Sequence, residues 1–409
     1  MVTPNRFRRT EPSALGADRV RYHERRVMRA AHPIVFPIVE RLGTKPVRRI
    51  PRLGVLVSDT TLMREVLLDQ RTYSKVGKGA SSDLWTPIMG PTAILNMHGE
   101  EHRALRRKLG PVFAPASVNA IVEDGQGPII RRMRDELDRR GEIDITRIAR
   151  TSASRMISRI AGIEDAPITD ELFQRITELT GLVKLTKPRF GEKEARIARE
   201  HLRPITESVE RRYRDGDPAH LPGFLRQLGL SADEAQGTIG ALVVTGTETL
   251  VAHIPRFIAM LIDSGGWDAF ARMNGGEREA VVQEGLRVTT PSPMMLRSAT
   301  ERSELGGVSI RPGDRMLLAT YLANQQPGSF SLTEDRASAQ QQLWFGAGPH
   351  FCLGAPLALA QIRGISNALA DTGAALRIIR REPARGVLVP GYRTLTVAAA
   401  NGTSTEERT

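Results

Sequence analysis

The stretch that decides the fold of this chain is Phe345-Gly346-Ala347-Gly348-Pro349-His350-Phe351-Cys352-Leu353-Gly354, which leads directly into a helical pattern over residues 355–370. Cys352 is the single cysteine in 409 residues, so an internal disulfide or a multi-cysteine metal site is excluded. A helix N-terminus carries unsatisfied N–H groups and about half a positive charge, which lowers the pKa of a nearby thiol. The position therefore favours a thiolate, the form of cysteine that binds metals.

The residues around the cysteine decide between a ligand and an inert thiol. An isolated cysteine is more often a buried, unreactive core residue. At roughly 5% usage per residue, however, the six fixed positions of this loop recur by chance with a probability of about 10⁻⁸ per start. Its three glycines allow close approach to a flat ligand, and Phe345 and Phe351 can shield the sulfur from water. The loop is therefore predicted to hold a metal ligand.

The loop resembles the haem-binding signature of the cytochrome P450 family, Phe-Gly-x-Gly-x-His/Arg-x-Cys-x-Gly, and every position matches. Further landmarks occur in the family's order, so the resemblance covers about Val47 to Ala398. It implies haem b, with Cys352 as the metal ligand. The cofactor-binding residues that it implies in the loop are Phe345, Gly346, His350, Cys352 and Gly354.

A polar interruption lies in the middle of the long apolar helical pattern over residues 234–263: Thr245-Gly246-Thr247-Glu248-Thr249. Glycine costs a helix interior about 1 kcal/mol and a buried carboxylate costs more unless paired, so the exception indicates a functional site rather than a simple polar bend. It resembles the family's Ala/Gly-Gly-x-Asp/Glu-Thr element, which implies that Glu248 and Thr249 deliver protons to bound oxygen. Thr245 departs from the usual small apolar residue and adds a hydroxyl at the catalytic site. Pro255 is expected to kink or end the helix.

Two pairs of charged residues share helix faces. Glu284 and Arg287 are three apart, and such pairs are usually exposed and weak. They match the family's Glu-x-x-Arg, and with Arg336 they resemble its buried structural cluster. His102 and Arg106 are four apart and resemble the family's propionate-binding helix, with Arg297 and His350 as two further propionate donors. His98-Gly99-Glu100 departs from the usual Asp-x-Pro before that helix.

Substrate contacts are expected from segments placed as in the family, although each residue is more often ordinary core. The predicted pocket residues are Trp85, Ile88, Met89, Ala241, Val244, Met294 and Met295, with the wider segments Leu172–Phe190, Pro293–Leu296 and Tyr392–Leu395. These positions predict an apolar, medium-sized organic substrate.

The expected fold is mainly α (α+β). The pattern over 47–57 predicts a hairpin, 60–68 a helix, 100–263 mostly helices, and 297–318 a second β-region. The resemblance implies the cytochrome P450 fold, a helix-rich triangular prism with small β-sheets and the haem between the long central helix and the Cys-loop helix. The predicted division is an N-terminal segment 1–46, one catalytic domain 47–400 and a polar tail 401–409.

Charge and targeting signals restrict partners and location. A net charge of +12 and a pI near 10.4 favour acidic partners, but the basic residues are scattered, and no nucleic-acid partner is expected. Neither a signal-peptide core nor a membrane span is evident, which predicts a cytoplasmic protein.

The resemblance implies a monooxygenase that uses O2 and receives electrons from a ferredoxin or flavodoxin-type partner with its reductase. Candidate docking residues are Arg103, Arg107 and Lys108. Three alternatives stay open: a peroxide-using variant, disfavoured by Glu248 and Thr249, a non-catalytic haem sensor or carrier, and a nucleic-acid-binding role, disfavoured by the scattered basic residues.

Overall fold

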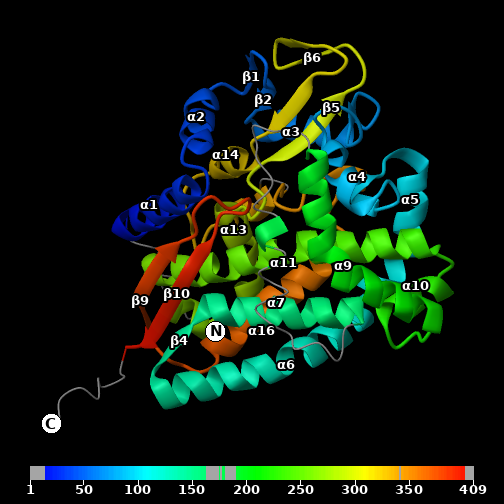
Figure 1. The fold of residues 1–409 in the computed structure, drawn as a ribbon. Helices are drawn as coiled ribbons and strands as arrows, with labels where there is room; N and C mark the ends of the chain where they lie inside the picture. Colours follow the sequence, from blue (N-terminus) through cyan, green and yellow to red (C-terminus); the bar gives the residue numbers. More distant parts are fainter. Residues whose placement is uncertain (1–13, 163–174, 176, 180–189, 340–341, 401–409) are drawn as a thin grey trace, which may run out of the picture.

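The computed structural model describes residues 14–162, 175, 177–179, 190–339 and 342–400. In these ranges helices dominate, with three small sheets toward the edges (Figure 1). This confirms the mainly α fold with small sheets. The predicted division into segments 1–46, 47–400 and 401–409 stays a prediction.

The long helix α11, Ala232–Asp263, runs through the middle of the molecule (Figure 1). It begins at a capping box in which Ser231 and Glu234 each accept from the other's backbone N–H. The helix continues through Pro255, so of the two expected outcomes, a kink or an end, the end does not occur; packing on all sides offsets the missing hydrogen bond. It is long and apolar enough to cross a membrane, but 72% of its most apolar window is buried inside the fold. An apolar helix covered in this way is a core helix.

Long helices surround α11 and enclose the main hydrophobic core. They are α6 Pro115–Arg140, α7 Ile145–Ala161, α9 Glu192–Asp215, α13 Gly275–Thr289 and α16 Ala355–Ala370. Helix α16 packs closely on α6 because Gly364 leaves room for Gln126, whose amide donates to the Gln361 carbonyl and the Ser152 hydroxyl, both at 3.0 Å. The helix that follows Cys352 is thereby fixed against the core.

The largest sheet has the strand order β1-β2-β8-β5-β3. Its strands are β1 Val47–Ile50, β2 Gly54–Val57, β3 Tyr73–Ser74, β5 Met295–Ala299 and β8 Arg315–Leu318. The predicted hairpin is confirmed, with Val47 opposite Val57. β2 pairs with β8 in parallel, which brings the N-terminal β-region beside the second one. Because β3 pairs with β5, this sheet places the segment after β3 beside Arg297.

The other strands form two smaller sheets. The first is β4 Glu142–Asp144, β10 Tyr392–Ala399 and β9 Leu376–Pro383, in that order; the second is β6 Ser303–Leu305 with β7 Val308–Ile310. The remaining helices are α1 Ala14–Ala31, α2 Val35–Leu42, α3 Thr60–Leu68, α4 Ser81–Met89, α5 Gly99–Lys108, α10 Leu221–Gln227, α12 Trp267–Arg272, α14 Thr320–Gln325 and α15 Arg336–Ala339, with short 3-10 turns at Ile94–Asn96, Gly110–Phe113 and Gly348–His350.

A buried ion pair fastens α1 to α11. Arg256 on α11 is fully buried and its guanidinium contacts both carboxylate oxygens of Glu24 on α1. The same guanidinium donates to the carbonyls of Pro390 and Thr289. The first described helix is therefore part of the packed core.

Candidate active site

The Cys352 loop has the compact conformation that its glycines permit. Gly346 and Gly348 have φ angles of +76° and +67°, in the left-handed region that favours glycine. A Cβ at Gly348 would lie 3.1 Å from the Leu67 carbonyl oxygen. The Cys352 N–H donates to the Phe345 carbonyl at 2.8 Å, and α16 starts three residues later. The predicted order of loop, cysteine and helix is confirmed.

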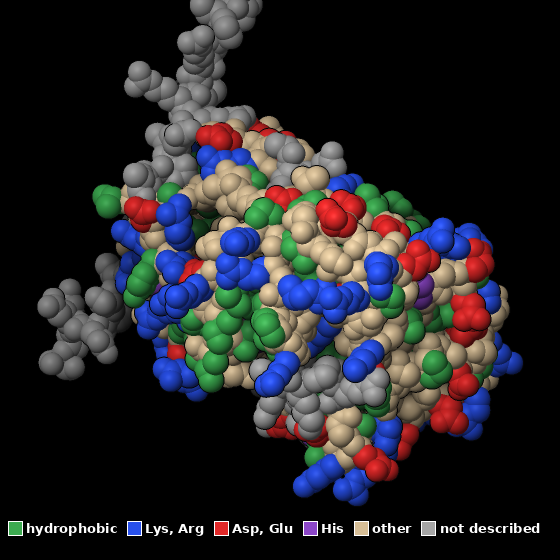
Figure 2. Space-filling model, turned by 90° about the horizontal axis from the view of Figure 1, so that it is seen from above, with side chains coloured by type: hydrophobic (Ala, Val, Ile, Leu, Met, Phe, Trp, Pro, Cys, Tyr) green, Lys and Arg blue, Asp and Glu red, His purple; other side chains and the backbone are tan. Residues whose placement is uncertain are grey.

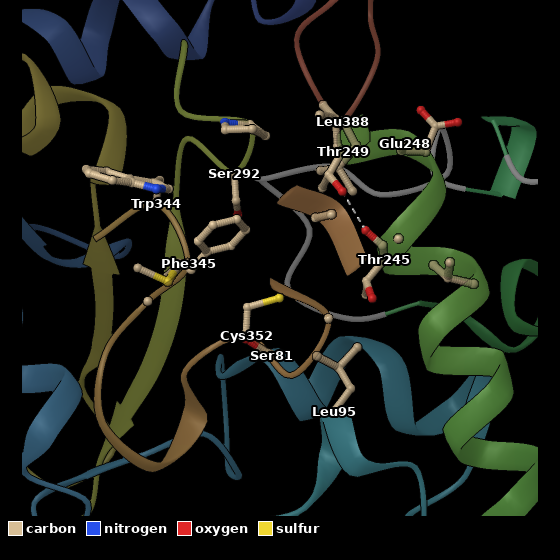
Figure 3. Close-up of a pocket in the computed structure, with 18 of the residues that line it drawn as sticks. Ser81, Leu95, Thr245, Glu248, Thr249, Ser292, Trp344, Phe345, Cys352 and Leu388 are labelled. Carbon is tan, nitrogen blue, oxygen red and sulfur yellow. Dashed lines mark hydrogen bonds between the residues drawn. The ribbon is translucent and has the colours of Figure 1, made fainter. Parts of the chain in front are cut away.

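The Cys352 thiol faces a cavity inside the molecule (Figure 3). Its surface is accessible from that cavity although the residue lies deep in the protein. Burial raises the thiol pKa, against the lowering effects of the Gly354 and Ala355 N–H groups, Arg106 and Lys75. The expected net lowering by the helix N-terminus is therefore wrong for the protein alone: desolvation of a thiolate outweighs the helix end.

Helix α11 forms the cavity wall across from Cys352 (Figure 3). The Thr249 hydroxyl donates to the Thr245 carbonyl at 2.9 Å, and the Thr245 hydroxyl donates to the Ala241 carbonyl at 2.7 Å. Both threonines therefore have their hydrogens engaged within the helix and keep oxygen lone pairs for a donor in the cavity. The structure places both on one helix face, one turn apart.

Glu248 lies on the rim of this wall, and its carboxylate is directed away from Cys352 (Figure 3). It accepts a 2.7 Å hydrogen bond from the Thr177 hydroxyl. Burial raises the pKa of Glu248, opposed by the Thr177 bond and Arg150. The acid–alcohol pair predicted from the sequence is adjacent along the helix, but its two side chains diverge.

Four predicted propionate ligands lie together in the wall of the cavity. His102, Arg106, Arg297 and His350 all line it, and the His102 and His350 ring centroids are 4.1 Å apart. Burial is the largest cause that lowers the pKa of Arg297 to about 10 and that of His102 to about 4. Lys75, which the sequence interpretation missed, joins them, and burial beside Arg297 lowers its pKa to about 7.

His98 is a second residue missed at this place. Its Nε2 lies 3.0 Å from the Gln70 carbonyl oxygen, which can only accept, so Nε2 donates. Its Nδ1 lies 3.2 Å from Nε2 of His350, and the two rings stack. His98 thus orients His350, at the position where the family pattern has an aspartate.

These residues fit a haem with two carboxylates. Three cations, Lys75, Arg106 and Arg297, line one cavity, and no ion pair involves them in the described part of the chain. The Nδ1 atoms of His102 and His350 are buried without a hydrogen-bond partner. A dianionic ligand would neutralise the three cations and accept hydrogen bonds from them, and a ring Nδ1 would donate to it in the tautomer that carries its proton there. The sulfur that would bind the iron opens into the same cavity.

The charged cluster next to the Cys loop is partly as predicted. Arg287 is fully buried and binds both carboxylate oxygens of Glu284 at 2.7 and 2.6 Å. Arg336 reaches the cluster through the Ser329 carbonyl, which accepts from both arginines, and it pairs with Glu334 at 2.7 Å. Its side chain is partly exposed, so Arg336 is a peripheral member. Glu284 also accepts from the Ser331 N–H, which fixes the segment leading to the loop.

The cavity has a volume of about 500 Å³ and mostly apolar walls. It is lined by the predicted residues Trp85, Ala241, Val244, Met294 and Met295. Ile88 and Met89 do not line the cavity, in contrast to the prediction; they pack beside Trp85 in the hydrophobic cluster that α4 forms with α9 and α11. Tyr392 and Leu395 are likewise core residues, because β10 faces the helices there. The expected contacts at 172–174, 176 and 180–189 lie outside the described residues.

His253 is a polar group in the wall that the sequence interpretation missed. It is buried one turn beyond Thr249, and its Nδ1 lies 2.8 Å from the Thr289 hydroxyl. Burial, together with Arg256, lowers its pKa to about 3, so the ring is neutral. Spacing would have found it, since residues 245, 249 and 253 lie on one helix face.

Comparison with known proteins agrees with this geometry. A model of the family "Cytochrome P450" matches residues 278–367. A C-19 steroid 1alpha-hydroxylase of Sorangium cellulosum is 28% identical over 343 residues, 80% of this chain and 86% of the relative. An erythromycin C-12 hydroxylase of Saccharopolyspora erythraea is 29% identical, covering 74% of this chain and 77% of the relative. The ligand-free structure of Mycobacterium smegmatis CYP164A2 superposes with a TM-score of 0.76 and 24% identity, covering 93% of this chain and 99% of that one.

The helix-rich fold, the Cys352 loop that opens into its cavity and these comparisons together define a haem-thiolate class of protein. The chain belongs to the cytochrome P450 family and is an oxidoreductase of the monooxygenase type.

Proposed function

We propose that the protein inserts one oxygen atom from O2 into an apolar organic substrate held between α4 and α11, by hydroxylation or epoxidation. The observation that carries this proposal is the cavity itself: Cys352 opens into it across from Thr245 and Thr249, and three cations line it without an acidic partner among the described residues. Haem b is the proposed cofactor, with Cys352 as the iron ligand and His102, Arg106, Arg297 and His350 as propionate ligands. When bound through a thiolate, haem activates dioxygen, because the sulfur donates electron density that favours O–O cleavage.

The α11 residues supply hydrogen bonds and protons in this proposal. The Thr249 oxygen accepts from a donor in the cavity, since its own hydrogen is used on the Thr245 carbonyl. Thr245 offers a second such acceptor one turn earlier. Burial raises the pKa of Glu248 and so favours its protonated form at the Thr177 side of the helix; in this proposal, rotation of its side chain brings a proton to Thr249.

The substrate class follows from the walls. Trp85, Met294 and Met295 present apolar surface, and methionines adapt to varied shapes. The relatives are named for a steroid and for erythromycin, which are large substrates. We propose a medium-sized to large, mostly apolar molecule.

Electrons come from a separate ferredoxin or flavodoxin-type protein in the cytoplasm, in this proposal. Helix α5 carries Arg103, Arg107 and Lys108, and Glu100 offsets part of that charge through ion pairs to both arginines. Basic side chains are spread over much of the upper face, interspersed with acidic and apolar ones (Figure 2). Such a surface would attract an acidic carrier and steer it only weakly.

The decisive experiment is the spectrum of the reduced carbon monoxide complex of the purified protein and of Cys352→Ser. The thiolate-bound complex has a red-shifted band that the serine variant should lose. Turnover with a surrogate ferredoxin system and a library of apolar compounds then tests chemistry: Thr249→Ala should keep the band but consume electrons with less product. An unchanged spectrum in Cys352→Ser, or substrate oxidation independent of O2, would contradict the proposal; oxidation with peroxide alone would favour the peroxide-using alternative.

A further inference from the structure

Lys75 occupies a place that neither haem-iron ligation nor substrate binding accounts for. It follows β3, where Ser74 pairs with Ser298 beside Arg297, and its side chain lines the cavity. Its charge lies close enough to Arg297 and Arg106 for both to disfavour its protonation. No carboxylate is among the groups that act on it; the Cys352 sulfur is the one opposing influence. A lysine kept in such surroundings requires an anion from elsewhere.

The same residue begins the segment that shapes the substrate wall. The Lys75 carbonyl accepts from the Ser82 N–H at 3.3 Å, in the first turn of α4. The loop between them is closed by the Gly79 N–H, which donates to Asp83 at 2.9 Å. Leu84 and Trp85 follow directly on α4 and line the cavity. One residue therefore connects the cationic group, through its side chain, with the start of the substrate wall, through its backbone.

A carboxylate is the ligand that this arrangement fits. Lysine binds as a compact point charge with three donors, and Lys75 has no protein acceptor in the described chain. The propionates proposed for His102, Arg106, Arg297 and His350 are the nearest source of negative charge that the protein would bind. Neutralising them is more favourable in this buried place than at the surface.

We infer that Lys75 binds a haem carboxylate and, through its backbone bond to Ser82, couples haem binding to the order of α4. The inference rests on the proposed haem site. It makes Lys75 a positioning residue for the substrate wall rather than a catalytic one.

The test compares the haem-loaded wild type with Lys75→Met, Lys75→Arg and the control Lys78→Met, an exposed lysine three residues along the same loop. Haem transfer to excess apomyoglobin is followed at the Soret band, and hydrogen exchange is measured for peptides covering residues 76–90. Lys75→Met should lose haem about 10-fold faster, the effect expected for one lost charge-assisted bond. It should also exchange faster in 76–90, while Lys75→Arg stays within about threefold of wild type on the charge argument.

The possible outcomes distinguish three statements: the contact of Lys75 with a haem carboxylate, the coupling of that contact to α4, and the proposed haem site itself. Equal haem loss in Lys75→Met and Lys78→Met overturns the carboxylate contact. Faster haem loss with unchanged exchange in 76–90 overturns the coupling to α4. A wild type that binds no haem, or lacks the red-shifted carbon monoxide band, contradicts the proposed function instead. Lys75→Gln is the second variant if Lys75→Met does not fold.

Discussion

Buried cations occur in two regions of this protein, and the two regions treat them differently. In the first region, Arg256 on α11 and Arg287 on α13 are fully buried, and each binds a carboxylate, of Glu24 and of Glu284 respectively. In the cavity, Arg297 is 4% exposed and Lys75 is partly buried, yet neither has a carboxylate partner in the described chain. Burying a charge is costly unless it is paired. The first region is electrostatically complete, whereas the second is complete only with an anionic ligand.

The two kinds of buried cation, paired and unpaired, have different roles in the protein. In the paired region the guanidinium groups also donate to main-chain carbonyls, as Arg287 does to Asn324 at 2.6 Å and Gly328 at 3.0 Å. These contacts fix the fold with or without a ligand. In the cavity the repulsion between cations is part of the free energy that ligand binding releases. Removing a cation should therefore have opposite effects on the haem-free protein in the two regions.

The largest effect is expected for the paired region. Glu284→Ala leaves Arg287 buried without its counter-charge and should lower the free energy of unfolding by about 3–5 kcal/mol. Urea unfolding followed by circular dichroism measures the loss, with the exposed Glu304→Ala as the control. A loss below about 1 kcal/mol would show that the pair is not what stabilises the segment.

An intermediate effect on stability is expected from the titration of His253. This buried residue avoids the cost of an unpaired buried charge because its ring stays neutral. Its pKa is lowered to about 3 in the folded protein, against about 6.5 when unfolded. The unfolded state therefore binds more protons between these values, and stability falls as the pH falls through this window. From pH 7 to pH 5 the expected loss is about 2 kcal/mol. His253→Gln should reduce the acid-induced loss by that amount in urea titrations at both pH values, whereas an identical loss would place the titration elsewhere.

The smallest effect on stability is expected for Arg297, and its sign should differ between the haem-free and the haem-bound protein. Arg297→Met removes an unpaired cation, so the haem-extracted protein should gain about 1 kcal/mol of stability while haem binding weakens. Thermal unfolding of both forms measures it, with exposed Arg377→Met as the control. If the haem-free variant loses stability, the repulsion is too small to matter and the comparison between the regions fails.

The features predicted from the sequence are those whose partners are close along the chain. The Cys352 loop is one contiguous motif, and Glu284 and Arg287 are three residues apart, so local spacing defines them. Lys75 and the pair of Arg256 with Glu24 depend on contacts between distant segments, and no local pattern marks them. His98 was noticed only as a departure from a pattern, and its bond to His350 spans 252 positions.

Two further errors have physical causes. Placing Ile88 and Met89 in the pocket followed from helix spacing, since they lie three and four residues after Trp85 and share its helix face; only the first part of α4, with Ser81, Leu84 and Trp85, borders the cavity, and the extent of that contact depends on the tertiary structure. The expected low thiol pKa of Cys352 used a local rule, the helix end, without the burial that only the tertiary structure supplies.

The contact between Glu24 and Arg256 has a consequence for synthesis on the ribosome. The two residues are 232 positions apart, and chains grow at about 5–20 residues per second. The first helix therefore emerges roughly 10 to 50 s before its partner exists. During that time α1 must remain solvated or bound to a chaperone, with the Glu24 carboxylate in water. It can take its final place only after the central helix has been made.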